Sequence, residues 1–273
     1  MSRRLLIAGI ALAVLVVVSL VLTFLPKARL EANRLASQNN LRELAMFAAH
    51  HHKPNPRPDP ARKFLAEIPS ATIFLPDVSP ENRLSWAVQV LPGLDQRKVN
   101  AAALLARIEQ GQPWPSEANQ RAARVRIASL LCPEGTPEVA EGEPGITCYV
   151  GVGGVGLGAP MLAPGAPKLG AFRYDGPTPF DRIEDGLSQT LLYGETRAGV
   201  GPWLRGGPST TRVFDDASAV PFVGGQFGGY FPTVAHFALC DGGVRSFTTK
   251  TDARVLLNMA TIAGKGYDAL PGE

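Results

Sequence analysis

The sequence has 273 residues, of which 45% are hydrophobic, 19% are charged and 7% are aromatic, and its net charge is only +3. This composition excludes wholesale disorder and a disulfide-dense miniprotein, and so small a charge does not indicate a nucleic-acid-binding protein. Of the 29 glycines and 24 prolines, only Gly9 and Pro26 lie within residues 1–52. The sequence therefore predicts two parts of different character.

Residues 5–25 form an uncharged apolar run in which only Ser19 and Thr23 are polar. A helix of this length crosses the hydrocarbon core of a bilayer, which is about 30 Å thick. We predict a single-span membrane anchor over residues 1–26, with a cytoplasmic N-terminus and an extracytoplasmic body. A cleaved signal peptide is the alternative, but the run is longer than a usual signal sequence and no A-x-A site follows it. Basic residues flank the run on both sides: Arg3, Arg4, Lys27 and Arg29.

Residues 27–52 predict an amphipathic stalk helix that continues the anchor, with a kink at Pro26. One face of this stalk carries apolar side chains at helical spacing, namely Leu41, Leu44, Ala45 and Ala48. The segment KPNPRPDP begins at Lys53 and must end the helix, because proline lacks a backbone donor and restricts the residue before it. We therefore place a third unit, the extracytoplasmic domain, at residues 53–273.

The first part of this domain contains short helical patterns at residues 84–90 and 98–110, and a further one lies at residues 252–263. In the last pattern Val255, Leu256, Met259 and Ile262 are expected to share one face. Trp86 and Trp114 are predicted to be core aromatics.

Short runs with strand character alternate with turn signals after residue 145, and we expect each run to form a strand: ITCYV, AFRY, TLLYGE, RVF, AHFALC and VRSFTT. Asp241-Gly242-Gly243 predicts a hairpin between the last two runs, because glycine supplies the positive φ of a tight turn. The order of the elements predicts an α+β fold, with the long helix packed on an antiparallel sheet.

The glycines at 151, 153 and 156 match the dinucleotide-binding pattern G-x-G-x-x-G. That mechanism requires a following helix whose N-terminus faces the pyrophosphate. Pro160, Pro164 and Pro167 prevent such a helix. We predict a flexible loop here and no nucleotide cofactor.

The histidines provide little support for a catalytic or metal site. His50, His51 and His52 are consecutive, so in a regular helix their side chains point about 100° apart and cannot bind one ion. His236 precedes Asp241 by five residues, which places the two side chains on opposite faces of a strand. The motifs G-x-S-x-G, H-E-x-x-H and CxxC are also absent from the sequence. We therefore expect no enzymatic activity and no catalytic residue.

The three cysteines leave the thiol chemistry open. In an oxidising compartment Cys132 and Cys148 are candidates for a disulfide, which would contribute about 3 kcal/mol by closing a short loop. Cys240 lies in an apolar run and is expected to be a small buried hydrophobic residue. Three free thiols are the alternative.

Several segments in this order resemble the planctomycete pseudopilin-like family of unknown function. They are ASQNNLRELAMFAAHHH, SWAVQVLPGLDQ, Pro113-Trp114, LLCPEG, TCYVGVGG, GAFRYDGPTPFDRIEDGLSQTLLYGE and HFALCDGGVRSFT. The resemblance covers nearly the whole chain and implies a type IV pilin-like helix followed by a β-rich domain. It implies no established enzymatic activity. The positions that match family signatures are Asp185, Gly186, Glu195, Asp241 and Gly242.

The sequence also departs from this family at three places. The residue five after Gly9 is Val14, where a prepilin peptidase site needs Glu. The residue ten before Asp241 is Phe231, where the C-terminal signature has His. Ser37 stands where relatives often have Cys, which leaves Cys132 without that partner.

Together these features predict a membrane-anchored, pseudopilin-like extracytoplasmic protein with a structural or interaction role. Its predicted partners are the membrane and other proteins, including further copies that assemble through the helix. The alternative is an exported hydrolase or ligand-binding protein with a site in the Gly-rich loops near His236. Calcium is the only cofactor that the residues suggest, since acidic loops supply oxygen ligands, with Asp185 or Asp241 as candidates.

Overall fold

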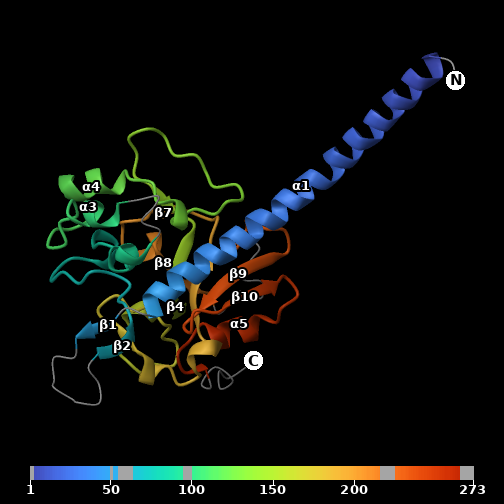
Figure 1. The fold of residues 1–273 in the computed structure, drawn as a ribbon. Helices are drawn as coiled ribbons and strands as arrows, with labels where there is room; N and C mark the ends of the chain where they lie inside the picture. The colour runs from blue at the N-terminus through green and yellow to red at the C-terminus, as the bar shows by residue number, and fades with distance from the viewer. Residues whose placement is uncertain (1–2, 50–51, 55–63, 95–99, 216–224, 265–273) are drawn as a thin grey trace.

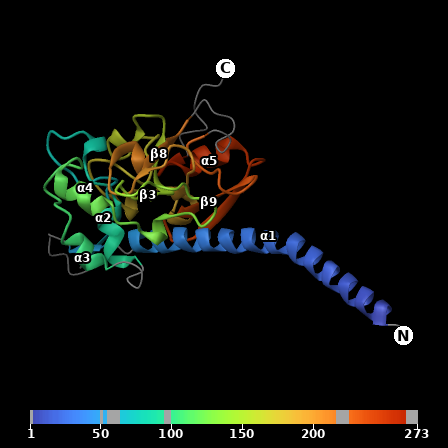
Figure 2. The same ribbon diagram turned by 90° about the horizontal axis from the view of Figure 1, so that it is seen from above.

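One long helix, α1 (Arg3–Ala49), projects from the body at its N-terminal end and lies along the body at its C-terminal end (Figures 1 and 2). The computed structural model describes residues 3–49, 52–54, 64–94, 100–215 and 225–264. A single helix runs through both the predicted anchor and most of the predicted stalk, as expected. Figure 2 shows a bend between the projecting part and the packed part, and Pro26 lies inside the helix. Proline removes one helical hydrogen bond and its ring crowds the preceding turn, which bends a helix.

The body is built around a five-stranded sheet with the strand order β10-β9-β6-β4-β8. Its strands are β4 (Tyr149–Val155), β6 (Leu191–Glu195), β8 (Thr211–Phe214), β9 (Val234–Leu239) and β10 (Val244–Thr248). Neighbouring strands are antiparallel except for β8, which pairs parallel to β4. The prediction of an antiparallel sheet is therefore wrong at this edge. A parallel pair needs a long crossover, and here the chain between β4 and β8 contains β6 and several turns.

Two smaller sheets flank the central one. The first has the order β1-β2-β5 and is formed by β1 (His52–Pro54), β2 (Phe64–Ile68) and β5 (Thr178–Pro179). The second pairs β3 (Ile146–Thr147) with β7 (Gly201–Pro202). The predicted strand AFRY does not form, because these residues make irregular backbone in which Phe172 is buried.

The remaining helices are short. The predicted helical patterns give α2 (Ala87–Val90), α3 (Ala101–Leu105) and α5 (Ala253–Met259), and α4 (Glu117–Ala123) lies outside every predicted segment. In α5 the expected shared face is wrong at Val255, which is 45% exposed, whereas Leu256 and Met259 are buried. Single 3₁₀ turns make up the rest: Pro80–Asn82, Leu91–Gly93, Ala128–Leu130, Ala159–Met161, Phe180–Arg182, Leu187–Gln189 and Gly207–Ser209.

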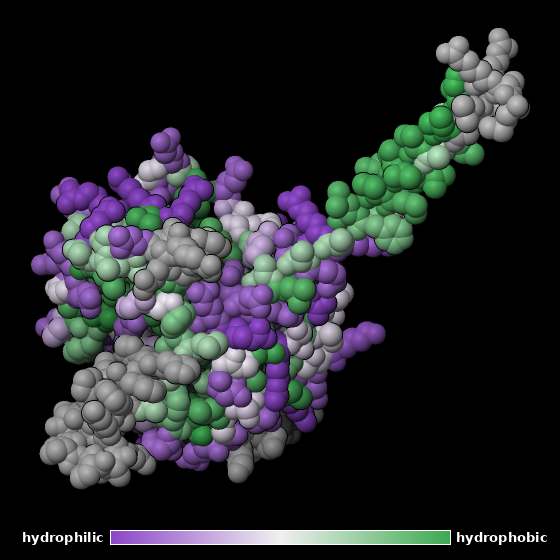
Figure 3. Space-filling view, viewed as in Figure 1, coloured by the Kyte–Doolittle hydropathy of each residue, from purple (hydrophilic) through white to green (hydrophobic). Residues whose placement is uncertain are grey.

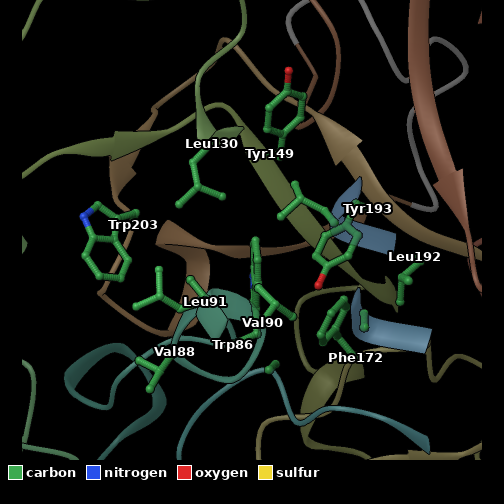
Figure 4. Packing of buried hydrophobic residues seen from close by; sticks show 14 of the residues in the cluster. Trp86, Val88, Val90, Leu91, Leu130, Tyr149, Phe172, Leu192, Tyr193 and Trp203 are labelled. Carbon is green, nitrogen blue, oxygen red and sulfur yellow. The ribbon is translucent and has the colours of Figure 1, made fainter. Parts of the chain in front are cut away.

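The central sheet lies between two layers, with α1 on one face and α5 on the other (Figure 2). Side chains alternate along each strand, so that β9 presents Ala238 to the α1 side and Phe237 to the α5 side. The α1 side is filled by Trp86, Phe172 and Tyr193, whose rings gather beneath the sheet (Figure 4). The prediction that Trp86 and Trp114 are core residues is confirmed, since both are buried.

The C-terminal half of α1 is one of the core elements. Four apolar side chains of one face are fully buried, as predicted: Leu41, Leu44, Ala45 and Ala48. They pack in the same cluster as the aromatic residues of the sheet and α2. The last part of α1, from Ser37 to Ala49, is therefore part of the body and not a free spacer.

The predicted flexible loop at the G-x-G-x-x-G pattern is wrong, because these residues form β4, which is buried along its whole length. The glycines are needed for packing. A Cβ atom built on Gly151 would lie 2.6 Å from a ring carbon of Phe172, and one on Gly153 would lie 2.5 Å from Pro160. Glycine lowers the strand propensity of this segment, but the aromatic and proline side chains fill the space that the missing side chains leave.

Replacing Gly151 with alanine is expected to lower the free energy of unfolding by about 2 kcal/mol, because the new methyl group would displace the Phe172 ring. Gly158→Ala is the matched control, since a Cβ there meets nothing within 4 Å and its φ is −86°. Urea unfolding of the two variants measures the difference. Equal stability of both variants would contradict this account of the glycine-rich strand.

Candidate functional site

A row of four polar side chains crosses the sheet beneath α1, one from each of four neighbouring strands. These side chains, the polar row, belong to Tyr149 on β4, Glu195 on β6, His236 on β9 and Ser246 on β10. The strand pairing aligns them, because Tyr149 lies opposite Glu195 and His236 lies opposite Ser246. The first three are fully or almost fully buried. Polar groups are costly to bury unless they are hydrogen-bonded, so their partners decide what the row does.

Three side chains of α1 supply most of these partners. The Ser37 hydroxyl donates to Glu195 Oε1 over 2.5 Å and lies 2.9 Å from the Tyr149 hydroxyl. Asn40 Nδ2 donates to Tyr149 Oη over 3.3 Å and to the Leu131 carbonyl over 3.2 Å. Gln38 Nε2 lies 3.3 Å from His236 Nδ1 and donates to Ser246 Oγ over 3.3 Å. The polar row thus fastens α1 to the sheet at one register.

Glu195 is the central group of the row. Its Oε2 atom accepts from the backbone N–H of His236 over 3.0 Å, and its Oε1 atom accepts from Ser37. Burial raises the pKa of this carboxyl to about 7, and the two hydrogen bonds and the Arg34 guanidinium offset only part of that effect. A buried carboxyl with a pKa near neutral can change its charge within the ordinary pH range, and here that charge lies against α1.

His236 is fully buried on β9, under the Phe231 ring and next to Ser246. Its Nδ1 atom lies 2.7 Å from Ser246 Oγ, while its Nε2 atom is buried and has no hydrogen-bond partner. Burial, with a smaller effect from Arg34, lowers the pKa of this imidazole to about 4. His236 is therefore neutral at physiological pH and is not open to solvent.

The cysteines lie next to the polar row. Cys132 and Cys148 share a buried cluster with Tyr230 and Phe231, and the structure holds all three cysteines as free thiols. The Tyr230 hydroxyl donates to Cys148 Sγ over 3.0 Å. The Cys132 thiol lies 3.8 Å from Ser37 Oγ, and burial raises its pKa to about 12. The Cys132–Cys148 disulfide stays a prediction. Cys240 is fully buried in the apolar core, as expected.

The two Asp-Gly signature segments lie side by side at the other end of β6. The backbone N–H of Asp241 donates to the Leu187 carbonyl over 3.2 Å, one residue after Gly186. Asp241 Oδ1 closes its own turn by accepting from the Gly243 N–H, whereas Asp185 Oδ2 accepts from the distant Gly264 N–H in the segment after α5. The predicted hairpin at Asp241 is confirmed, with Gly242 at a φ of +88°.

Calcium binding at Asp185 or Asp241 stays a prediction. Within the described ranges, no three side chains of His, Cys, Asp or Glu lie close enough to hold an ion. Asp185 and Asp241 each already accept a backbone hydrogen bond. His50 and His51 lie outside the described residues, and of His52 only the backbone in β1 is described.

Sequence reasoning found Glu195 as a signature position and His236 as a candidate, but it did not connect them through α1. Gln38 and Asn40 were predicted only as part of a stalk, and Ser37 only as a stalk residue that replaces a cysteine of the relatives. The signal that could have found them is the polar run Ser37-Gln38-Asn39-Asn40, which directly precedes the buried apolar face that begins at Leu41.

Comparison with protein families places this geometry in context. Residues 26–220 match the model of a family described as "Protein of unknown function (DUF1559)". This range holds 195 of the 273 residues, which is more than half of the chain. The chain belongs to this family. The sequence of this chain matches no curated protein, and no solved structure matches the chain.

The DUF1559 region begins at Pro26, where the apolar run ends, and it includes Ser37, Tyr149 and Glu195. His236 and the C-terminal Asp-Gly turn lie beyond it. The predicted membership in a family of unknown function is confirmed at that level, and the pseudopilin-like character stays a prediction.

Proposed function

We propose that this protein is a single-pass membrane-anchored, pseudopilin-like protein whose body lies outside the cytoplasm and has a structural or interaction role. The proposal rests on the contrast between the two ends of α1. Its N-terminal half is a fully solvent-exposed apolar rod, and its C-terminal half is a core element of the body.

The surface of α1 supports membrane insertion. Figure 3 shows the projecting part as a continuous hydrophobic surface, whereas the visible face of the body is mostly hydrophilic. Large side chains all around this part are exposed, for example Leu15 at 67% and Leu22 at 70%. An apolar helix that is exposed on every side is stable only in a bilayer or against other apolar helices.

Other proteins are the second class of partner in this proposal, through copies of the helix or through the body. The observations on His236 do not favour the alternative of a hydrolase or ligand-binding site there. Its fully buried ring lies between Gln38 of α1 and Ser246 of the neighbouring strand β10, where a substrate has no access.

Substituting Leu15 and Val18 together with arginine is expected to release the chain from carbonate-washed membranes, because each arginine near the centre of a span costs about 3 kcal/mol. The double variant Leu35→Arg with Asn39→Arg is the matched control, since it adds the same charge to exposed positions of α1 beyond the apolar run. The control should stay in the membrane fraction.

Protease treatment of intact cells tests the orientation. We expect loss of an epitope at the C-terminus and protection of one at the N-terminus. A protected body with an accessible N-terminus would overturn both the proposed topology and the proposed extracytoplasmic role.

A further inference from the structure

The hydrogen bonds between α1 and the sheet near Glu195 form one chain in which each donor can be assigned. Asn40 Nδ2 donates to the Leu131 carbonyl, which can only accept, and this orients the amide so that the same nitrogen donates to Tyr149 Oη. The one proton of the Ser37 hydroxyl goes to Glu195 Oε1. The Tyr149 hydroxyl, 2.9 Å from Ser37 Oγ, is therefore the donor in the remaining contact.

This donor chain, which runs from Asn40 through Tyr149 and Ser37 to Glu195, ends at a carboxyl group that only accepts. Its other oxygen, Oε2, accepts from the backbone N–H of His236 over 3.0 Å. Among the residues that the structure describes, these are the two hydrogen bonds of the Glu195 carboxyl. The arrangement therefore satisfies every member of the donor chain while Glu195 is ionised.

A proton on Glu195 reverses the donor chain. Oε2 faces an N–H group, which cannot accept, so the proton has an acceptor only when it lies on Oε1 and points to Ser37 Oγ. Ser37 must then turn its own proton to Tyr149 Oη. The Tyr149 proton loses its acceptor, because the Asn40 nitrogen that faces it is a donor. Buried donors are rarely left unpaired, so the contact between Tyr149 and Asn40 must change.

The two protonation states of Glu195 are therefore each unfavourable in one respect, since one has a buried charge and the other has an interrupted donor chain. Burial raises the pKa of Glu195 to about 7, and the hydrogen bonds from Ser37 and His236 and the charge of Arg34 oppose that rise. Both states are consequently populated near neutral pH.

The other titratable groups that face Glu195 keep their charge in this range. Burial raises the pKa of Cys132 to about 12 and raises the pKa of the Tyr149 hydroxyl well above its ordinary value. Burial lowers the pKa of His236 to about 4, and the guanidinium of Arg34 on α1 stays charged. A change near pH 7 in this cluster is therefore due to Glu195.

We propose that the donor chain is a pH-sensitive switch between α1 and the sheet, in which protonation of Glu195 reverses the Ser37 and Tyr149 hydroxyls and releases the Asn40 amide from Tyr149. Ser37 and Asn40 are neighbours on one face of α1, so the change reaches the helix at two points. The same helix contains the projecting apolar part, and proton uptake at Glu195 therefore alters how that part is held to the body. The switch lies within the body and does not depend on the proposed membrane role.

Nuclear magnetic resonance of the full-length protein in detergent micelles tests this switch, with ¹⁵N-labelled asparagine and ¹³C-labelled glutamate, from about pH 5.5 to about pH 8.5. In the wild type the side-chain amide signals of Asn40 should shift with the same midpoint as the Glu195 carboxyl, near pH 7. Asn39 is the internal control. It is exposed on the same helix outside the donor chain, so its amide signals should show no transition at that midpoint.

Tyr149→Phe distinguishes the switch from simple titration, because it removes the middle of the donor chain. Glu195 should still titrate in this variant, but the Asn40 amide should no longer respond. Ser37→Ala removes a donor to the carboxylate, so the midpoint of Glu195 should rise by about one pH unit and the Asn40 response should disappear. Gln38→Ala is the matched control, since it removes a different polar contact of α1 and should leave the Asn40 response intact.

Three results would each overturn the proposal. They are an Asn40 amide that stays constant while Glu195 titrates in the wild type, an Asn40 response that survives in Tyr149→Phe, and a Glu195 carboxyl that does not titrate in this pH range.

Discussion

Leu44→Ala is expected to lower the free energy of unfolding by about 3 kcal/mol, as is typical when a fully buried leucine is truncated. Leu44 is 0% exposed and packs in the cluster that contains Trp86 and Tyr193. The loss tests whether α1 is a structural part of the body, because a helix that served only as a spacer would tolerate the change.

Leu35→Ala provides the comparison within the same helix. Leu35 is 60% exposed, so truncating it to alanine makes the same chemical change but leaves no cavity in the core. We expect its effect to stay within about 0.5 kcal/mol, as for most surface substitutions. Urea unfolding of both variants in the same detergent measures the difference, and similar losses at the two positions would contradict the role given to α1.

Glu195→Gln is expected to change the pH dependence of stability. Because the folded pKa of Glu195 is about 7 and its ordinary value is 4.5, the folded carboxyl keeps a proton that the unfolded chain releases between these pH values. The stability that protonated Glu195 contributes is therefore complete below pH 4.5 and is lost as pH rises through 7. The shift corresponds to about 3 kcal/mol, and glutamine has no such loss.

His236 produces the opposite slope. Its folded pKa of about 4 lies below its ordinary value of 6.5, so the unfolded chain binds more protons between these values and stability rises with pH there. The two slopes largely cancel in the wild type. Removing Glu195 exposes the rise that is due to His236.

The measurement is the difference in unfolding free energy between Glu195→Gln and the wild type from pH 4 to pH 8, because the His236 contribution is the same in both and cancels. We expect this difference to move in favour of the variant by about 3 kcal/mol. Glu109→Gln, at an exposed carboxyl, should give a flat difference. A flat difference for Glu195→Gln as well would show that this carboxyl is not buried beneath α1.

The parts of the fold that follow from local pattern were predictable. The 3.6-residue spacing of Leu41, Leu44 and Ala48 indicated the buried face of α1, and the Asp241-Gly242 turn indicated the last hairpin. Both features depend on residues that are close in sequence.

The features that were missed depend on partners far away in sequence. Gly151 and Gly153 favour a loop by propensity, but Phe172 and Pro160 make them a buried strand. The candidate site was missed for the same reason, since Ser37 and Glu195 are 158 residues apart and meet only when α1 docks on the sheet. No local pattern records a pairing over such a distance.

The continuity of α1 has a mechanical consequence. The apolar run is joined to the body through continuous helix that packs across β9 and β6, two inner strands of the sheet, and not through a loop at its edge. We therefore expect a force on the projecting apolar end of α1 to reach the middle of the sheet and not its edge. Pro26 removes one helical hydrogen bond between the projecting part and the packed part, so we expect the helix to yield there first and a load on the projecting part to tilt the body before it strains the core.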